Sequence, residues 1–192
     1  MENRSAKIKT ICGCIDHCFA YAMWCEDFAP HLDPDDMIWG LDRAADLLAE
    51  ASMLQSFLAL RKLDDFLGGV TPKPGDLTAA DFGIEAPGVL GEVGSAFLAK
   101  DERETINKGV AHLTEDLSLD ADSEVDLHQI LERSIPVLSR LVGELRKLDT
   151  AQEATSSLDG TEDLIGRAKN IKTPAEKRAE AAQAQKPPER QD

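Results

Sequence analysis

The feature that most constrains the fold of this chain is the helical spacing of its apolar residues. Near the start they recur at intervals of three and four, which places them on one helical face: Ile8, Ile11, Ile15, Cys18, Ala22 and Cys25. A second series of this kind is formed by Leu127, Leu131, Leu138, Leu141, Leu145 and Leu148. Aromatic residues make up only 5% of the chain, which favours helix over strand. The sequence therefore predicts an all-α fold.

Turn and capping residues divide this pattern into four main helices, predicted to form an up-down bundle. Asp33 and Pro34 are typical of a helix N-terminus, and the pair Gly68-Gly69 is typical of a helix end. The four helices are expected to span about 5–28, 34–67, 95–113 and 123–149. In the second, one face should be buried by Leu47, Ala51, Leu54 and Leu58. Pro136 should kink the fourth.

Two segments depart from the bundle pattern. Residues 68–95 contain seven of the thirteen glycines and three prolines, which predicts a connecting loop with one helical turn at 78–82. Its apolar residues suggest that the loop lies on the bundle. Residues 151–192 are polar, so we expect a largely disordered tail with a short helix near 161–169. The predicted organisation is a helical domain over 1–150 and a tail over 151–192.

The chain is strongly acidic, with a net charge of −15. Residues 1–150 alone contain 14 basic and 28 acidic side chains. Such a field repels phosphate backbones, so RNA is a possible partner but a disfavoured one, and binding it would need a local basic site. The N-terminal residues resemble neither a signal peptide nor a membrane span. We therefore expect a cytoplasmic protein without a membrane partner.

The four cysteines, Cys12, Cys14, Cys18 and Cys25, lie within one predicted helix, with His17 among them. This grouping suggests a metal site, but structural zinc sites usually combine two short clusters from different elements. Buried thiols packed in the core are the favoured interpretation, and disulfides within one helix are disfavoured. The sequence predicts no metal and no cofactor.

Two charged runs have ordinary explanations. The carboxylates from Asp116 to Asp126 alternate as calcium ligands do, but they lack the loop's central glycine and its closing glutamate. A solvated loop that caps the next helix is expected there. Arg61, Lys62, Asp64 and Asp65 predict a surface ion-pair network, with a contribution to a polar site as the alternative.

One short motif, in residues 106–114, has a possible chemical role. Thr105, Lys108 and His112 share a helical face, so a cation and a titratable imidazole lie together there. Gly109 would let another chain or a ligand approach the backbone closely. A single histidine on a helix is more often structural or on the surface, and that interpretation stays open.

The run Asn107-Lys108-x-x-Ala111-His112-Leu113, late in an all-α bundle, resembles the HEPN superfamily of prokaryotic toxin–antitoxin and defence systems. Many members are metal-independent ribonucleases with an Arg-Asn-x4-His motif in a homodimer cleft. The resemblance implies roles for Asn107 and His112 at the matching positions. Ile106 stands where the arginine is expected. Arg103 lies three residues earlier, on what we expect to be a different face.

Three functional hypotheses follow, of which the first two rest on the resemblance. The first is a HEPN-like interaction module that is dimeric and non-catalytic, with a possible protein partner. The second is an endoribonuclease in which His112 acts as acid and base, Asn107 positions the substrate, and Lys108 or Arg103 stabilises the phosphate. The third is a structural helical adaptor with no pocket. Whether the chain is an enzyme stays open.

Overall fold

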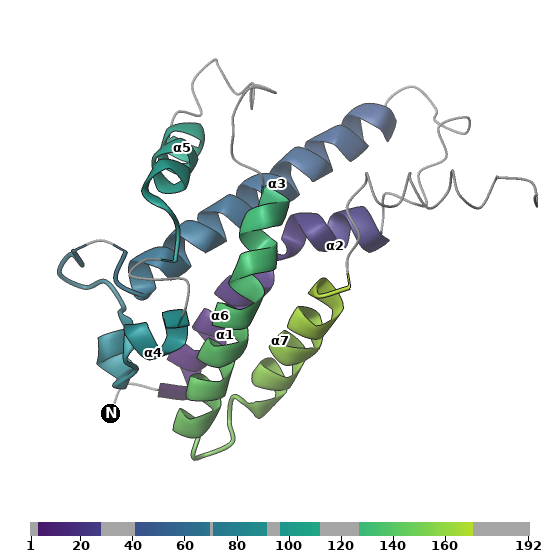
Figure 1. The fold of residues 1–192 in the computed structure, drawn as a ribbon. Coiled ribbons are helices and arrows are strands. Elements are labelled where there is room, and N and C mark those ends of the chain that lie inside the picture. The colour runs from purple at the N-terminus through teal and green to yellow at the C-terminus, as the bar shows by residue number, and fades with distance from the viewer. Residues whose placement is uncertain (1–3, 28–40, 70, 92–96, 112–126, 171–192) are drawn as a thin grey trace, which may run out of the picture.

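The structure is a computed structural model that describes residues 4–27, 41–69, 71–91, 97–111 and 127–170 (Figure 1). The regular structure of these residues is entirely helical, which confirms the predicted all-α class. The elements are α1 (Arg4–Cys18), α2 (Ala20–Asp27), α3 (Leu41–Phe66), the 3-10 helix η2 (Ala79–Phe82), α4 (Ala86–Leu90), α5 (Lys100–Ala111), α6 (Leu127–Leu148) and α7 (Thr155–Ala168).

Helix α1 lies at the centre of the bundle and contacts α2, α3, α6 and α7. In Figure 1 it is seen behind α6, with α7 on one side. The apolar stripe predicted for this helix is buried, since Ile8, Ile15 and Cys18 have no exposed surface. The core forms around this stripe.

The first predicted helix is wrong in one respect, because it is broken at Phe19 into α1 and α2. Phe19 is fully buried, and its N–H donates to the carbonyl of Asp16 at 3.1 Å. The N–H of Tyr21 donates to Oγ of Ser56 on α3, at 3.2 Å. Ser56 is buried and thus satisfies a backbone donor that the break releases. A contact from another helix stabilises this break, so periodicity could not predict it.

The buried side of α3 also differs from the prediction. Its core residues include Phe57, Leu60, Leu63 and Leu67 just beyond its end. The face predicted to be buried is instead open: Leu47 is 56% exposed, Ala51 is exposed, and Leu54 and Leu58 are half-buried. Leu48 beside it is 59% exposed. The predicted start of this helix, with Asp33 and Pro34, lies outside the described residues.

The connecting segment packs on the bundle as predicted. Thr78 and Asp81 form a capping box at the start of η2, where the helical turn was expected. Phe82, Val89 and Leu90 are buried. The short helix α4 was not predicted. Its last carbonyls are bound by Arg140 of α6, with Nε at 2.6 Å from the oxygen of Val89 and Nη2 at 2.8 Å from that of Leu90.

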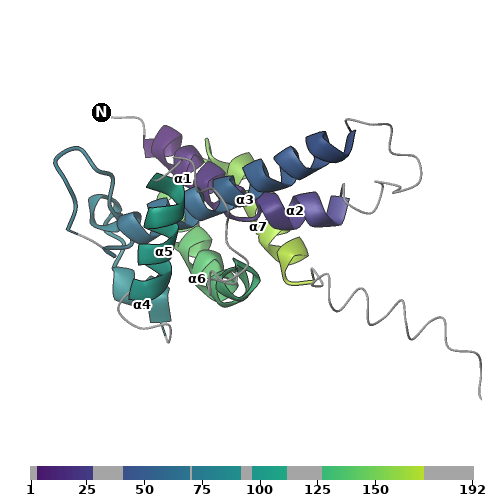
Figure 2. The same ribbon diagram turned by 90° about the horizontal axis from the view of Figure 1, so that it is seen from above.

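Helix α6 continues through Pro136, which is exposed. Helix α7 follows it and packs against both α6 and α1 (Figure 2). Leu158, Thr161 and Ile165 of α7 are buried, so the helical fold extends beyond residue 150, where the polar tail was predicted to begin. The described helices outnumber the four main helices predicted, and their up-down order stays a prediction. None of the described helices is long and apolar enough to cross a bilayer.

Candidate functional site

The first part of the motif singled out in the sequence, residues 106–111, lies at the end of α5. Lys108 is exposed and Asn107 is half-buried. The Oδ1 atom of Asn107 is inaccessible to solvent and has no hydrogen-bond partner among the described residues. His112 lies outside the described residues, so the structure brings together two of the three predicted site residues. The acidic run from Asp116 to Asp126 also lies outside them.

Ile106, at the position of the motif arginine, belongs to the hydrophobic core. It is 3% exposed and its side chain lies with the buried apolar residues of the bundle. An arginine there would place a guanidinium among apolar groups, which is costly without a charged partner. The helix therefore presents this position to the interior.

Arg103, one turn before Ile106, is bound by two carboxylates of α3. Its Nη1 pairs with Oδ2 of Asp64, and its Nη2 pairs with Oδ1 of Asp65. The Arg103 side chain is only 14% exposed, and burial lowers the pKa of its guanidinium. The predicted separation of Arg103 and Ile106 onto different faces is wrong, because both turn toward the bundle. Arg103 joins α5 to α3.

Asp64 is the most buried charged side chain of this cluster, at 1% exposed. Its Oδ1 accepts the backbone N–H groups of Phe97 and Leu98 at 3.1 and 3.0 Å, while Oδ2 pairs with Arg103. The surface ion-pair network predicted here is thus wrong for Asp64, because it faces inward. A Cβ on Gly69 would overlap its carboxylate. Because Gly69 has no Cβ, it leaves room for the Asp64 carboxylate.

A second ion pair ties α5 to α6. Oε2 of Glu102 pairs with Nη2 of Arg133 and also accepts the N–H of Ala99 at 2.8 Å. Sequence reasoning missed this pair. The only local signal was the pair of acidic residues in the first turn of α5, which is typical of a helix start.

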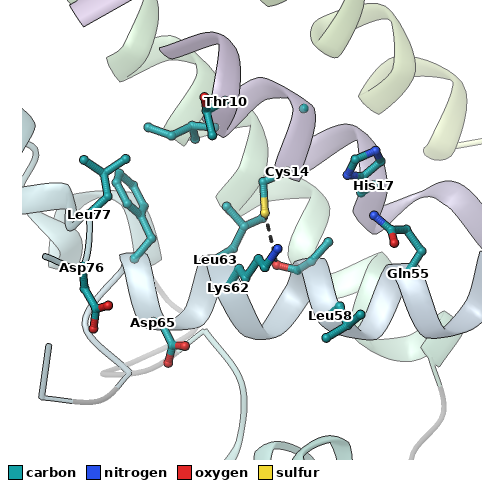
Figure 3. A pocket seen from close by; sticks show the side chains of 14 residues that line it. Thr10, Cys14, His17, Gln55, Leu58, Lys62, Leu63, Asp65, Asp76 and Leu77 are labelled. Atoms are coloured by element: carbon teal, nitrogen blue, oxygen red, sulfur yellow. Dashed lines mark hydrogen bonds between the residues drawn. The ribbon is translucent and has the colours of Figure 1, made fainter. Parts of the chain in front are cut away.

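An open groove of about 500 Å³ lies between α1 and α3 (Figure 3). Its apolar surface comes chiefly from Ile11, Leu58, Leu63, Phe66 and Leu77. Asp65 and Asp76 lie at one end, and His17 and Gln55 lie at the other. The groove was not predicted, because it depends on how two helices distant in sequence meet.

The thiol that faces this groove is not a reactive nucleophile. Sγ of Cys14 donates to the carbonyl of Ala59 at 3.5 Å. Burial raises the pKa of Cys14 to about 11, although the charge of Lys62 acts in the opposite direction. Burial also raises the pKa of Cys12 and Cys18, which lie in the core as predicted. These thiols are protonated at neutral pH and would react slowly.

Metal-ligating side chains do not gather in the part of the chain that the structure describes: it contains no group of three or more His, Cys, Asp or Glu placed to hold an ion. Helix α5, which carries Asn107 and Lys108, is therefore joined to the bundle by ion pairs, and the groove lies between α1 and α3. Comparison with protein families, curated proteins and solved structures finds no match to this chain.

Proposed function

We propose that this protein is a HEPN-like helical interaction module of a toxin–antitoxin or defence system that forms a homodimer and does not catalyse a reaction. The observation that carries the proposal is the exposed apolar face of α3, called the α3 stripe here: Leu47, Ala51, Leu54 and Leu58. These residues share one helical face, and the core residue Leu60 lies on the opposite one. An apolar face of this kind on a helix is typical of a protein interface.

A second copy of the chain is the partner that fits this surface best. In a two-fold dimer, the α3 stripe of one protomer would pack against the same stripe of its partner, as two apolar helix seams do. Asp65 lies two turns beyond Leu58 on the same face and holds α5 through Arg103. The interface would therefore lie beside the helix that carries Asn107 and Lys108.

The absence of catalysis in this proposal rests on the cations of α5. A metal-independent ribonuclease needs positive charge on the phosphate as the 2′-hydroxyl attacks. The arginine position is occupied by the buried Ile106, and Arg103 is neutralised by Asp64 and Asp65. Lys108 is exposed, but it supplies a point charge without the two-pronged geometry of an arginine. Cleavage with His112 as acid and base stays the alternative.

A cytoplasmic location is part of the same proposal. Cys12, Cys14 and Cys18 are free thiols in the described structure, which suits a reducing compartment.

Sedimentation velocity over a concentration series tests the dimer. We expect the mass of the wild type to rise from that of a 20.9 kDa monomer to twice that value as concentration increases. Leu47→Glu adds a charge to the α3 stripe at an exposed site, so it should leave the fold intact and keep the protein monomeric. Ala151→Glu adds the same charge at an exposed site between α6 and α7, and it should dimerise as the wild type does.

Two results would contradict the proposed dimer. One is a wild type that stays monomeric throughout the series. The other is a Leu47→Glu variant that associates as strongly as wild type and Ala151→Glu.

A further inference from the structure

The groove between α1 and α3 has the size and the mixed character of a small-molecule site. Its volume of about 500 Å³ lies in the range of ligand pockets, which is roughly 300–1,000 Å³. Ligand sites of this kind combine a largely apolar surface with a few polar groups that orient the ligand. Leu63, Phe66 and Leu77 supply apolar surface here, and polar side chains lie in the middle of the groove and at both ends.

The acidic end of the groove is already neutralised by cations of the same chain. Asp65 pairs with Arg103, and Arg61 and Lys73 lie close enough for their charges to act on it. Asp76 belongs to the same cluster, because its charge also acts on Asp65. This end therefore offers no excess of negative charge to an incoming cation.

Lys62, in the middle of the groove, is a cation without such a partner. It is exposed and forms no ion pair with any residue that the structure describes. Figure 3 shows its side chain reaching toward Cys14. The pKa of that thiol is about 11, so it is protonated at neutral pH and does not neutralise the lysine.

Two further donors lie at the end of the groove away from the carboxylates. Gln55 lies two turns before Lys62 on the same face of α3. The His17 side chain of α1 lies beside it in Figure 3. The side-chain amide and the imidazole can each donate an N–H group. The middle of the groove and this end are therefore suited to an acceptor with a negative charge.

We propose that this groove binds a small amphipathic carboxylate of the fatty-acid type. The carboxylate of the ligand lies between Lys62 and Gln55, and its apolar chain extends along Leu63 and Phe66 toward Leu77. The ligand then brings one negative charge to the unpaired lysine, and its chain removes apolar surface of the groove from water.

The net charge of −15 acts against this ligand at long range. At about 0.15 M salt, however, charges on the surface are largely screened beyond roughly 8 Å. The charges nearest to the bound carboxylate then decide its affinity, and the nearest one is that of Lys62.

The test is a titration of the ¹⁵N-labelled full chain at pH 7 and about 0.15 M salt, followed by two-dimensional NMR of the backbone amides. Octanoate, octanol and octylammonium have apolar chains of similar length and differ in the head group. We expect saturable shifts around residues 10–17, 55–66 and 76–77. Octanoate should bind about fivefold more tightly than octylammonium. Hexanoate should bind about fivefold more weakly than octanoate, since it buries two fewer methylene groups.

Matched variants assign the preference for the carboxylate to Lys62. Lys62→Gln removes the charge at an exposed site and should weaken octanoate about fivefold while leaving octanol unchanged. Lys62→Arg keeps the charge and should restore binding to within about twofold of the wild type. Lys100→Gln makes the same change as Lys62→Gln at a site on α5 that is 92% exposed and outside the groove. It should bind all the probes as the wild type does.

Leu58 lies in both the groove and the α3 stripe, so the proposed dimer would border the bound ligand. The titration is therefore repeated with Leu47→Glu, in which the stripe should stay unpaired. This variant should bind octanoate whether or not the wild type dimerises, because all the proposed contacts come from one chain. Failure of the dimer thus leaves this proposal standing, and failure of the groove to bind octanoate leaves the dimer standing.

Three outcomes would overturn the proposal. One is the absence of saturable octanoate binding in the wild type and in Leu47→Glu. Another is a set of shifts that cluster away from the groove. The third is a loss of affinity in Lys62→Gln no larger than that in Lys100→Gln, or octylammonium binding as tight as that of octanoate.

Discussion

Asp64 combines two interactions that hold the start of α5 against the bundle. One carboxylate oxygen accepts two backbone N–H groups and the other pairs with Arg103. At 1% exposed it has no access to water that could replace either interaction. Its neighbour Asp65 also pairs with Arg103, but its side chain is 38% exposed. Removal of the Asp64 carboxylate and removal of the Asp65 carboxylate should therefore lower the free energy of unfolding by different amounts.

We expect Asp64→Ala to lower the free energy of unfolding by about 3 kcal/mol, because it leaves buried donors and a largely buried guanidinium without their acceptor. Asp65→Asn serves as the control and should cost about 1 kcal/mol or less, as partly exposed ion pairs do. Equilibrium unfolding in urea measures both values. Equal losses in the two variants would contradict the distinct role of Asp64.

Among the helices, α7 lies beyond residue 150, where the helical domain was predicted to end. One buried polar contact joins it to α1. Oγ1 of Thr161 donates to Oδ1 of Asp16 on α1 at 2.7 Å. Thr161 is fully buried and Asp16 is half-buried. Burial raises the pKa of Asp16 more than the hydrogen bond from Thr161 lowers it. This contact fixes how α7 lies on α1.

Thr161→Val keeps the shape of the side chain but removes the donor. It should lower the free energy of unfolding by about 1.5 kcal/mol at pH 7, where Asp16 is ionised and accepts the stronger bond. The hydrogen bond lowers the pKa of Asp16 in the folded protein, so the loss should shrink as pH falls through that pKa and Asp16 becomes protonated. The exposed Ser156→Ala is the control.

Chemical denaturation at pH 7 and near pH 4 checks this expectation. A loss that is the same at both pH values would show that the contact with ionised Asp16 does not stabilise α7. A loss in Ser156→Ala as large as that in Thr161→Val would show that the effect is not specific to the buried threonine.

The structural features that the sequence predicted correctly are those indicated by residues close together in the sequence. The all-α class, the stripe of α1, the turn at η2 and the helix stop at Gly68, with its φ of 93°, follow from spacing, capping and backbone conformation. The buried face of α3 was predicted wrongly because leucines occur around much of its circumference. The spacing of the apolar residues then cannot indicate which face of α3 packs against α1.

The candidate site was predictable only where it lies within one helix. Asn107 and Lys108 could be placed on a common helix from their spacing alone. The pairing of Arg103 with Asp64 joins residues far apart in sequence, and so does the groove between α1 and α3. Such contacts depend on how helices pack, which a local pattern does not encode.

For the whole molecule, the net charge and the buried position of Ile106 both argue against cleavage of RNA. A net charge of −15 repels RNA, and Arg103 is neutralised inside the protein instead of facing a substrate. A protein of this kind can use its helices for recognition without using them for phosphate chemistry. Our proposal is therefore that the motif in residues 106–114 does not cleave RNA.

Incubating purified wild type and His112→Ala with a mixed RNA pool, metal-free and at high protein concentration, tests this claim. We expect the pool to remain intact with both proteins, and circular dichroism should show that both are equally helical. Cleavage by the wild type that disappears in His112→Ala would contradict the proposed absence of catalysis and make this protein a ribonuclease despite Ile106.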